Sequence, residues 1–416
     1  MTNILNKELL AHKFINSSNS SIKRFGYSYF HQQIQNILIK YPTLLENTLD
    51  GKSNVLKLID DISKIFPVNL IRQLPLSDLM RSNRSRQSAL KQLKSNKYLS
   101  RKFLEYIKEE EQLFDMRNRL VGGKNKPYIS DKALRRVQEQ DSANNKFLTS
   151  MLGDKTCVES FLEKQDKLRS SVLYQQVKTL EDIAIARDYD FLFITISATP
   201  EHHSNTLHNT MYHQWNGESV RVTHEKFNYQ FKLHRNYLYR HKLSINLEKS
   251  ASIKTVEPTN SGCPHYHIVL FCDRSLTNKY IQSYKKYFKN DFANLDIKRF
   301  TSSKLKRKRT HNLSYISNYI LKHCFILGTT RDTKKTERVI AWRKYNRIRA
   351  YHISGIQKKF LEYKKIKLHN LEKVTPDDIG ESREYSHIEF LNYLIFDLSY
   401  KIKTCNTNSK KHTHQT

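Results

Sequence analysis

Two runs of strand-forming residues with a short turn between them constrain the fold of this chain more than any other feature. The runs cover residues 251–258 and 265–272, and the residues between them include Thr-Asn-Ser-Gly-Cys. β-Branched and aromatic residues favour strands, whereas Asn, Ser and Gly favour the tight connections that join them. We therefore expect a β-hairpin, in which the two strands pair antiparallel.

The order of the elements around this hairpin predicts an α+β fold. Residues 189–197 (YDFLFITIS) have the composition of a strand with a buried face, and helices are expected over residues 221–241 and around residues 278–288. A basic segment and a further helix, which contains SYISNYILKH, follow. This order fits an antiparallel sheet flanked by helices.

The regions on either side of this domain have a different character. Residues 1–120 repeat apolar positions at intervals of three and four, which predicts a mainly helical, basic accessory region. Its basic stretch, residues 80–110, fits either a DNA contact or an ordinary solvated helix face. Residues 121–187 are expected to form a helical lead-in with Ser130 as an N-cap. Residues 366–416 are expected to hold one amphipathic helix and a disordered basic tail.

The charge of the chain indicates a polyanionic partner. The 416 residues include 72 Lys and Arg against 40 Asp and Glu, a formal net charge of +32. Such a surplus destabilises a compact chain by self-repulsion unless a polyanion offsets it. Nucleic acid is the partner expected first, because neutralising phosphates releases condensed counterions. An anionic membrane surface is the alternative, although no lipidation motif is evident.

Neither a membrane span nor a disulfide framework is expected. The longest apolar stretch, residues 191–198, is far shorter than the roughly 20 residues that a bilayer requires. The N-terminus lacks the long apolar run of a signal peptide, so we expect the protein to stay in the cytoplasm. The five cysteines are scattered and odd in number, which favours reduced thiols.

A pair of histidines in the second strand of the hairpin is the strongest chemical feature. His265 and His267 point to the same face of a strand, whereas Tyr266 points the other way. Two imidazoles at this spacing can chelate a divalent ion, although a bare pair of this kind is commonly structural. A metal that holds a phosphodiester prefers a carboxylate as well, and Glu257 could reach across the hairpin. Mg²⁺ or Mn²⁺ suits these ligands and would act as a Lewis acid on a phosphate.

A pair of tyrosines is the second chemical feature. Tyr315 and Tyr319 are four residues apart and share one face of the expected helix, and Lys322 can share that face. Because the phenol has an ordinary pKa of about 10, a tyrosine nucleophile needs nearby cations and an activated phosphate. Packing is the alternative explanation in a chain with 24 tyrosines.

Together, these motifs resemble the HUH endonuclease superfamily, and most closely the bacteriophage replication gene A protein family. FLFITISATP, VEPTNSGCPHYHIVLF and YISNYILKH match the three motifs of the family in their expected order. The segments PYISDKALRRVQEQDSANNKFL and VIAWRKYNRIRAYHISGI also resemble the family, so the likeness covers about residues 120 to 365.

The resemblance implies a rolling-circle replication initiator. Such an enzyme nicks one strand at an origin, stays attached through a 5′-phosphotyrosine and leaves a free 3′-OH for a polymerase. Residues 188–365 would then form the HUH catalytic domain, with an RRM-like sheet. His265 and His267 become metal ligands, with Glu257 at the acidic position before them, and Tyr315 and Tyr319 become the paired nucleophiles.

Two positions depart from the family pattern. Asn318 stands where relatives often have Lys, and His323 stands where they often have Asn. The missing lysine after Tyr315 leaves Tyr319, near Lys322, as the better placed nucleophile. We therefore expect Tyr319 to make the first attack and Tyr315 the second, which terminates transfer.

The expected partners follow from charge and from an absent motif. Single-stranded or supercoiled origin DNA would be gathered by a basic segment that contains Lys304, Lys306, Arg307, Lys308 and Arg309. No G-x-x-x-x-G-K-[ST] motif is present, so unwinding would fall to a host helicase and synthesis to a host polymerase. An HUH-type transposase or relaxase, or a nonenzymatic nucleic-acid-binding protein, remains the alternative. A single-tyrosine transposase would not need Tyr315, and relaxases usually carry a third histidine.

Overall fold

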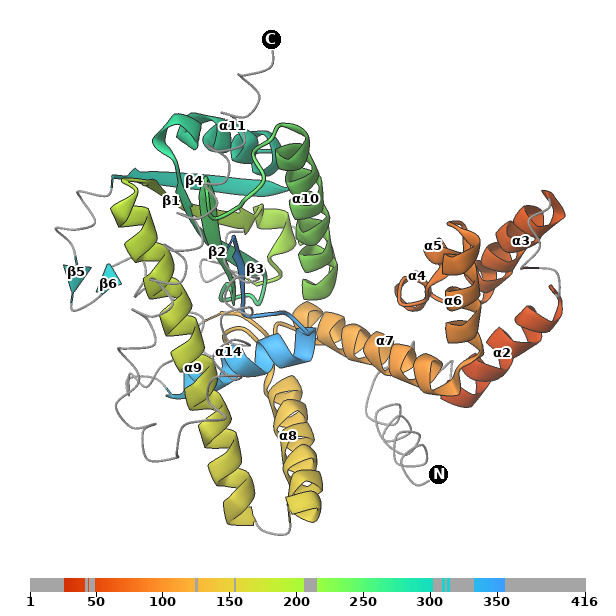
Figure 1. Ribbon diagram of the computed structural model, residues 1–416. Helices are drawn as coiled ribbons and strands as arrows, with labels where there is room; N and C mark the ends of the chain where they lie inside the picture. Colours follow the sequence, from red (N-terminus) through yellow and green to blue (C-terminus); the bar gives the residue numbers. More distant parts are fainter. Residues whose placement is uncertain are drawn as a thin grey trace, which may run out of the picture. The chain divides into compact units, whose positions relative to one another are not determined.

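The computed structural model describes residues 26–41, 44, 49–123, 126–152, 155–205, 215–301, 309–310, 313–314 and 333–355. These residues form a mixed α+β protein, which confirms the predicted fold class. The chain divides into two compact units, Met1–Asn118 and Arg119–Thr416 (Figure 1). None of the helices in the described ranges is long and apolar enough to cross a membrane.

The described part of the first unit is helical. Three aromatic rings form the centre of its core: Phe30 stacks on Phe103 at 5.4 Å between ring centroids and meets the edge of Phe66 at 5.2 Å. Serine caps begin two of its helices, since Ser82 accepts a hydrogen bond from Ser85 N and Ser95 accepts one from Tyr98 N. The helices are α2 (Tyr27–Ile39), α3 (Leu49–Ile65), α4 (Val68–Ile71), α5 (Leu76–Leu79), α6 (Asn83–Lys94) and α7 (Asn96–Arg117).

One cation of the basic stretch in this unit has a structural role. Arg86 is buried, and its guanidinium donates hydrogen bonds to the backbone oxygens of Leu79, at 3.0 Å, and Leu44, at 3.4 Å. A buried charge needs such partners, so Arg86 holds the connection before α6 rather than facing a polyanion. Its neighbour Arg84 is exposed.

The second unit combines a sheet with flanking helices. Ser130 begins its first helix as predicted, because its hydroxyl accepts a hydrogen bond of 3.1 Å from Ala133 N. The helices are α8 (Asp131–Leu152), α9 (Lys155–Ala186), α10 (Val220–Arg240), α11 (Thr277–Phe288) and α14 (Thr333–Asn346), with 3-10 turns η2 (Pro200–His202) and η3 (Arg274–Leu276). The strands are β1 (Asp190–Ala198), β2 (Ser250–Pro258), β3 (Pro264–Cys272), β4 (Ala293–Phe300), β5 (Arg309–Thr310), β6 (Leu313–Ser314) and β7 (Tyr351–Ser354).

The main sheet is antiparallel throughout, in the order β4-β1-β3-β2-β7. The predicted hairpin is β2 and β3, and the predicted strand over residues 189–197 is β1, so these expectations are confirmed. Strands β4 and β7 were not expected from the sequence. They are the two edge strands of the sheet, where charged residues are common and the strand signal is weak.

Helices cover the two faces of this sheet. On one face, the ring of Tyr266 packs against Phe227 and Phe231 of α10, at 4.7 and 5.3 Å between centroids, so Tyr266 points away from the histidines as predicted. On the other face, α9 contributes Leu173, Val177 and other apolar side chains to a core shared with the strands. Figure 1 shows α10 and α11 together on one side of the sheet and α9 running along the other.

Helix α14 braces the turn of the hairpin. The indole Nε1 of the fully buried Trp342 donates a hydrogen bond of 2.8 Å to the backbone oxygen of Gly262. Gly262 has a φ of +83°, and a Cβ placed there would lie 2.7 Å from the backbone oxygen of Tyr128. Glycine is therefore required in this turn on two grounds, the backbone conformation and the close approach of another segment.

Replacing Gly262 with Ala is expected to reduce the free energy of unfolding by about 2 kcal/mol or more, since it adds a steric clash to an unfavourable φ. Urea unfolding followed by circular dichroism measures the loss. Gly217→Ala is the matched control, because Gly217 has a φ of +79° with no atom within 4 Å of the added Cβ. Equal losses in the two variants would show that the contact with Tyr128 is unimportant.

Candidate functional site

The sheet face that α9 covers changes from apolar to polar along the strands. Residues directly opposite each other in antiparallel strands point to the same side, so the register sorts this face into rows. Each row runs from β4 across β1 and β3 to β2. The first two rows are mainly apolar: Phe300, Phe191, Phe271 and Ala251, then Lys298, Phe193, Val269 and Ile253. The last two rows are polar: Asp296, Thr195, His267 and Thr255, then Asn294, Ser197, His265 and Glu257. We call the last two the polar rows.

The first two rows anchor the sheet. The core cluster under α9 takes its residues of β1, β2 and β3 from them and adds Ile353 of β7, which is opposite Ile253. The rings of Phe191 and Phe271 meet edge to face at 4.7 Å. Burying such apolar side chains contributes roughly 1.5–3 kcal/mol each. These first two rows, which we call the apolar rows, therefore form a rigid base. The polar rows continue the same strands.

The structure brings the two predicted imidazoles together. The ring centroids of His265 and His267 are 4.5 Å apart, with an interplanar angle of 72°. His267 is 6% exposed, its ring stacks on Phe193 at 5.6 Å, and its Nδ1 lies 3.3 Å from the hydroxyl of Thr195. A hydrogen bond at Nδ1 fixes the ring and makes Nε2 the nitrogen suited to a metal.

Glu257, the third predicted ligand, lies on the neighbouring strand. It is directly opposite His265 in the register, so the two side chains share a row and a side of the sheet. Within the ranges that the structure describes, no group of three or more His, Cys, Asp or Glu side chains is arranged to hold a metal ion. The histidine pair is thus the part of the predicted metal site that the structure assembles, and the role of Glu257 stays a prediction.

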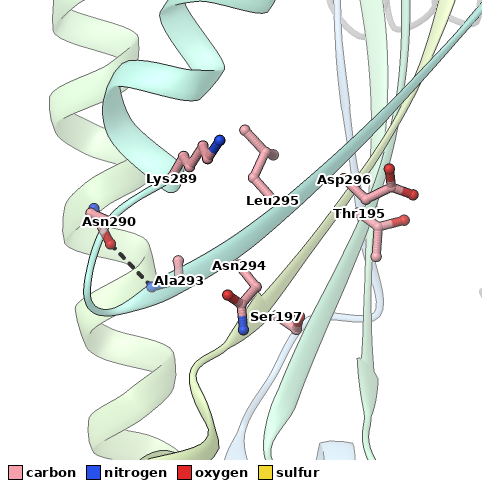
Figure 2. Close-up of a pocket in the computed structure, with 8 residues that line it drawn as sticks. All are labelled: Thr195, Ser197, Lys289, Asn290, Ala293, Asn294, Leu295 and Asp296. Atoms are coloured by element: carbon pink, nitrogen blue, oxygen red, sulfur yellow. Dashed lines mark hydrogen bonds between the residues drawn. The ribbon is translucent and has the colours of Figure 1, made fainter.

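An open pocket of about 470 Å³ begins at the polar rows and extends over the edge strand β4. Its lining includes Thr195 and Ser197 from β1 and Asp296 from β4, and Figure 2 shows the Asp296 carboxylate beside the Thr195 hydroxyl. Lys289, after α11, and Asn294 add a cation and an amide. Hydroxyls, an amide and an ammonium are the groups that bind phosphate oxygens.

Sequence reasoning missed Thr195 and Asp296. Thr195 lies in the predicted strand, and the two-residue period of a strand puts it on the same face as Phe193 and Ser197. Its partner across the sheet, however, depends on the register of β1 with β3. Asp296 lies on an unexpected strand, and its side chain is 60% exposed beside Lys298. The alternation of Leu295 and Ile297 with charged residues is the signal that could have revealed that strand.

Replacing Thr195 with Val is expected to weaken divalent-metal affinity about tenfold, because Val cannot hold Nδ1 of His267. Isothermal titration with Mn²⁺ measures the change. Thr195→Ser keeps the hydroxyl and is expected to restore most of the affinity. An unaltered affinity in the Val variant would mean that Thr195 does not position the ring.

Tyr266, between the two histidines in sequence, is excluded as a nucleophile by its surroundings. It is fully buried, and its hydroxyl lies 2.7 Å from Nδ1 of His224. Burial raises the pKa of Tyr266 and lowers the pKa of His224 to about 4. The phenol is therefore held neutral in the core under α10.

The remaining predicted site residues lie outside the described part of the chain. They are Tyr315, Tyr319 and Lys322, with the basic residues Lys304, Lys306, Arg307 and Lys308. Arg309 begins β5, whose backbone alone is described. Their predicted roles in catalysis and DNA binding are therefore carried forward as proposals.

Comparison with known proteins places the chain in a family. The family model described as bacteriophage replication gene A protein (GPA) matches residues 50–324, about two-thirds of the chain. The match begins in the first unit, earlier than the likeness seen in the sequence motifs. It also ends before the segment VIAWRKYNRIRAYHISGI, which contains most of α14.

Two curated relatives are similar to parts of the chain. The probable replication protein P12 of Pseudoalteromonas phage PM2 is 23% identical over 216 residues, 49% of this chain and 32% of the relative. The replication gene A protein of Escherichia phage P2 is 27% identical over 188 residues, 40% of this chain and 24% of the relative.

These alignments thus span about a third and a quarter of the relatives' own lengths. No solved structure matches the chain. The match of the family model over the hairpin, the histidine pair and the helices before them leads to one conclusion: this chain belongs to the bacteriophage replication gene A protein family.

Proposed function

We propose that the protein is a metal-dependent, sequence-specific single-strand DNA endonuclease and strand transferase that starts rolling-circle replication of phage DNA through a 5′-phosphotyrosine. The observation that carries the proposal is the pair of imidazoles on the polar rows, His265 and His267, in a chain of the replication gene A family. A role in phage DNA replication follows from the family. The chemistry of nicking and transfer is inferred from the residues.

The types of donor on the polar rows suit a divalent ion. Two imidazoles share one side of β3, Glu257 is opposite His265, and hydroxyls of β1 occupy the same rows. Imidazole and carboxylate ligands suit Mn²⁺ or Mg²⁺ when water and a phosphate oxygen complete the coordination. Such an ion would supply Lewis-acid polarisation of the scissile phosphate.

The protein's own residues would bind and orient the DNA strand. Lys289 and Asn294 line the pocket beside the polar rows and can hold phosphate oxygens of a strand that crosses β4. Thr195 keeps the His267 ring in one orientation, and the apolar rows beneath α9 keep the strands rigid. A rigid site holds the scissile phosphate for attack without further ordering.

The covalent step exchanges one phosphate ester for another. The Tyr319 hydroxyl loses its proton and its oxygen forms a bond to phosphorus, while the bond from phosphorus to the 3′ oxygen breaks and that oxygen leaves as a 3′-OH. Lys322 favours the phenolate or holds the phosphate. Rejoining is the reverse step and needs no ATP. Tyr315 serves the second transfer, because the first tyrosine is occupied during replication.

A cleavage assay on single-stranded origin DNA tests this function. An oligonucleotide labelled at its 3′ end is expected to be cut with Mn²⁺ or Mg²⁺ and left intact with EDTA. The downstream product should migrate with the protein in a denaturing gel. Binding without cutting under every metal condition would favour a nonenzymatic DNA-binding protein. Cutting that gives two free DNA ends would exclude the phosphotyrosine.

A further inference from the structure

A second surface with the chemistry of nucleic-acid binding lies on the other side of the sheet. Helices α10 and α11 pack together there and point one side of each helix outward (Figure 1). Residues 226–240 and 277–289 contain no Asp or Glu. Apart from Lys226, which pairs with Glu218, and Lys289, which lines the pocket beside the polar rows, their exposed cations are Lys232, Arg235, Arg240, Lys279, Lys285 and Lys286. We call this surface the basic layer.

The carboxylates that flank these two helical stretches in sequence lie at their ends. In the first turns of α10, Glu225 pairs with Arg221 at 3.0 Å, and Glu218, just before the helix, pairs with Lys226. Asp291 follows α11. Along the rest of α10 and α11, no Asp or Glu of the same helix offsets the positive charges. The resulting positive potential attracts a polyanion.

Exposed aromatic rings accompany these cations. Tyr229 and Tyr239 of α10 are 58% and 76% exposed, and both fall on the same outward stripe as Lys232 and Arg235. Leaving a large ring in water is unfavourable for the isolated protein. An exposed phenol ring is, however, a platform on which an unpaired base can stack.

Further rings and cations join the two helices. The ring of Tyr237 lies 4.0 Å from that of His241 and 5.5 Å from that of Tyr287 on α11. The Lys286 ammonium lies 4.8 Å from the centroid of the Tyr237 ring. Rings interleaved with cations thus continue across the boundary between α10 and α11.

At one edge of the same face, cations gather closely. Lys254 of β2 is opposite His352 of β7 in the register, and its Nζ lies 3.9 Å from the centroid of Phe231. Burial and then the charge of Arg235 lower the pKa of Lys254 to about 8. The pKa of His352 is lowered, mainly by burial and then by the positive charges of Lys254, Arg349 and Arg235. A phosphate near these groups would relieve their mutual repulsion.

We propose that the basic layer is a second binding surface for single-stranded DNA, separate from the polar rows. Its cations bind backbone phosphates, and Tyr229 and Tyr239 stack on unpaired bases. Phosphate contacts and stacking on base faces carry little sequence information, so this binding is expected to be largely independent of sequence. It goes beyond the proposed nicking activity and does not depend on it.

Fluorescence anisotropy with a labelled 20-nucleotide oligo-dT, in EDTA, tests the proposal. The His265→Ala, His267→Ala background removes the proposed metal ligands, so cleavage cannot confuse the result. Adding Arg235→Gln and Lys286→Gln is expected to weaken binding about tenfold at low salt. The plot of the logarithm of the association constant against the logarithm of the salt concentration should become less steep by about 1.4, because each phosphate contact accounts for about 0.7 of the slope. Tyr229→Ser with Tyr239→Ser is expected to weaken binding about tenfold without that change in slope.

Lys146→Gln with Lys164→Gln is the matched control, because both lysines are exposed on α8 and α9 and the loss of charge is the same. Equal weakening by the control pair would overturn the proposal and indicate an effect of net charge alone. Binding to vesicles with anionic phospholipid in preference to oligo-dT would overturn it in favour of a membrane. Cleavage of a short origin oligonucleotide by Arg235→Gln, Lys286→Gln in an otherwise unaltered chain tests the nicking activity independently.

Discussion

The His265→Ala, His267→Ala double variant is expected to cleave single-stranded origin DNA at least about 1000-fold more slowly than the wild-type protein. Removing both imidazoles removes the histidine pair of the proposed metal site, whose ring centroids lie 4.5 Å apart. Metal polarisation of a phosphate is worth several kcal/mol of barrier, and each 1.36 kcal/mol is a factor of ten in rate. Single-turnover cleavage in Mn²⁺ measures the loss.

The control for this variant is His31→Ala, which replaces a histidine on α2 in the first unit. The control protein should cleave at the wild-type rate. Thermal unfolding of the double variant separates loss of the site from loss of the fold. His267 is buried against Phe193, so His267→Asn provides a second variant that keeps a polar side chain in place. Metal-dependent cleavage at the wild-type rate by the folded double variant would refute the assignment of these ligands.

Tyr319→Phe is expected to abolish the first covalent attachment to origin DNA. The variant loses the oxygen that is proposed to form the first phosphate ester, and the effect should be complete within the detection limit of a denaturing gel. Tyr315→Phe is expected to attach normally and to fail in the second transfer, which closes the displaced circle. A labelled suicide oligonucleotide reports the first step, and a preformed adduct offered a second origin strand reports the other.

The two variants also test the order of attack. Attachment that persists in Tyr319→Phe and vanishes in Tyr315→Phe would reverse the order. Attachment in the double variant would exclude both residues. Tyr29→Phe, on an exposed position of α2, is the control for the loss of a phenol elsewhere.

Much of the second unit could be predicted because its central strands carry local signals. Side chains in the run from His265 to Cys272 point alternately to the two faces of the sheet, and both faces are buried at the apolar end of the run. The composition and the two-residue period of this run therefore both indicate a strand. Turn residues separate it from the strand before it. Antiparallel pairing and the shared face of the two histidines follow from these local features alone.

The parts that could not be predicted depend on contacts between distant residues. Asp296 belongs to an edge strand that pairs with β1, and this pairing joins residues about a hundred positions apart in sequence. The contact between Thr195 and His267 likewise depends on the register of β1 with β3. Arg86 looks like its exposed basic neighbours in sequence, and only the fold shows that it donates hydrogen bonds to the backbone of Leu79 and Leu44.

The sheet thus combines three environments on continuous strands. The apolar rows under α9 supply rigidity, the polar rows supply imidazoles and hydroxyls, and the opposite face carries α10 and α11. Tyr266 and His267 illustrate the division: one ring lies in the core under α10, and the next side chain faces Thr195. The two-residue period of β3 lets one strand serve both faces.

Manganese binding at the histidine pair tests the central claim most directly. Electron paramagnetic resonance of the wild-type protein titrated with Mn²⁺ is expected to show one tightly bound ion per chain. Weak hyperfine coupling to ¹⁴N should show that imidazole nitrogen is a ligand. The His265→Ala, His267→Ala variant should lose both signals while its circular dichroism is unchanged. A bound ion with the same affinity and the same nitrogen coupling in that variant would contradict the account.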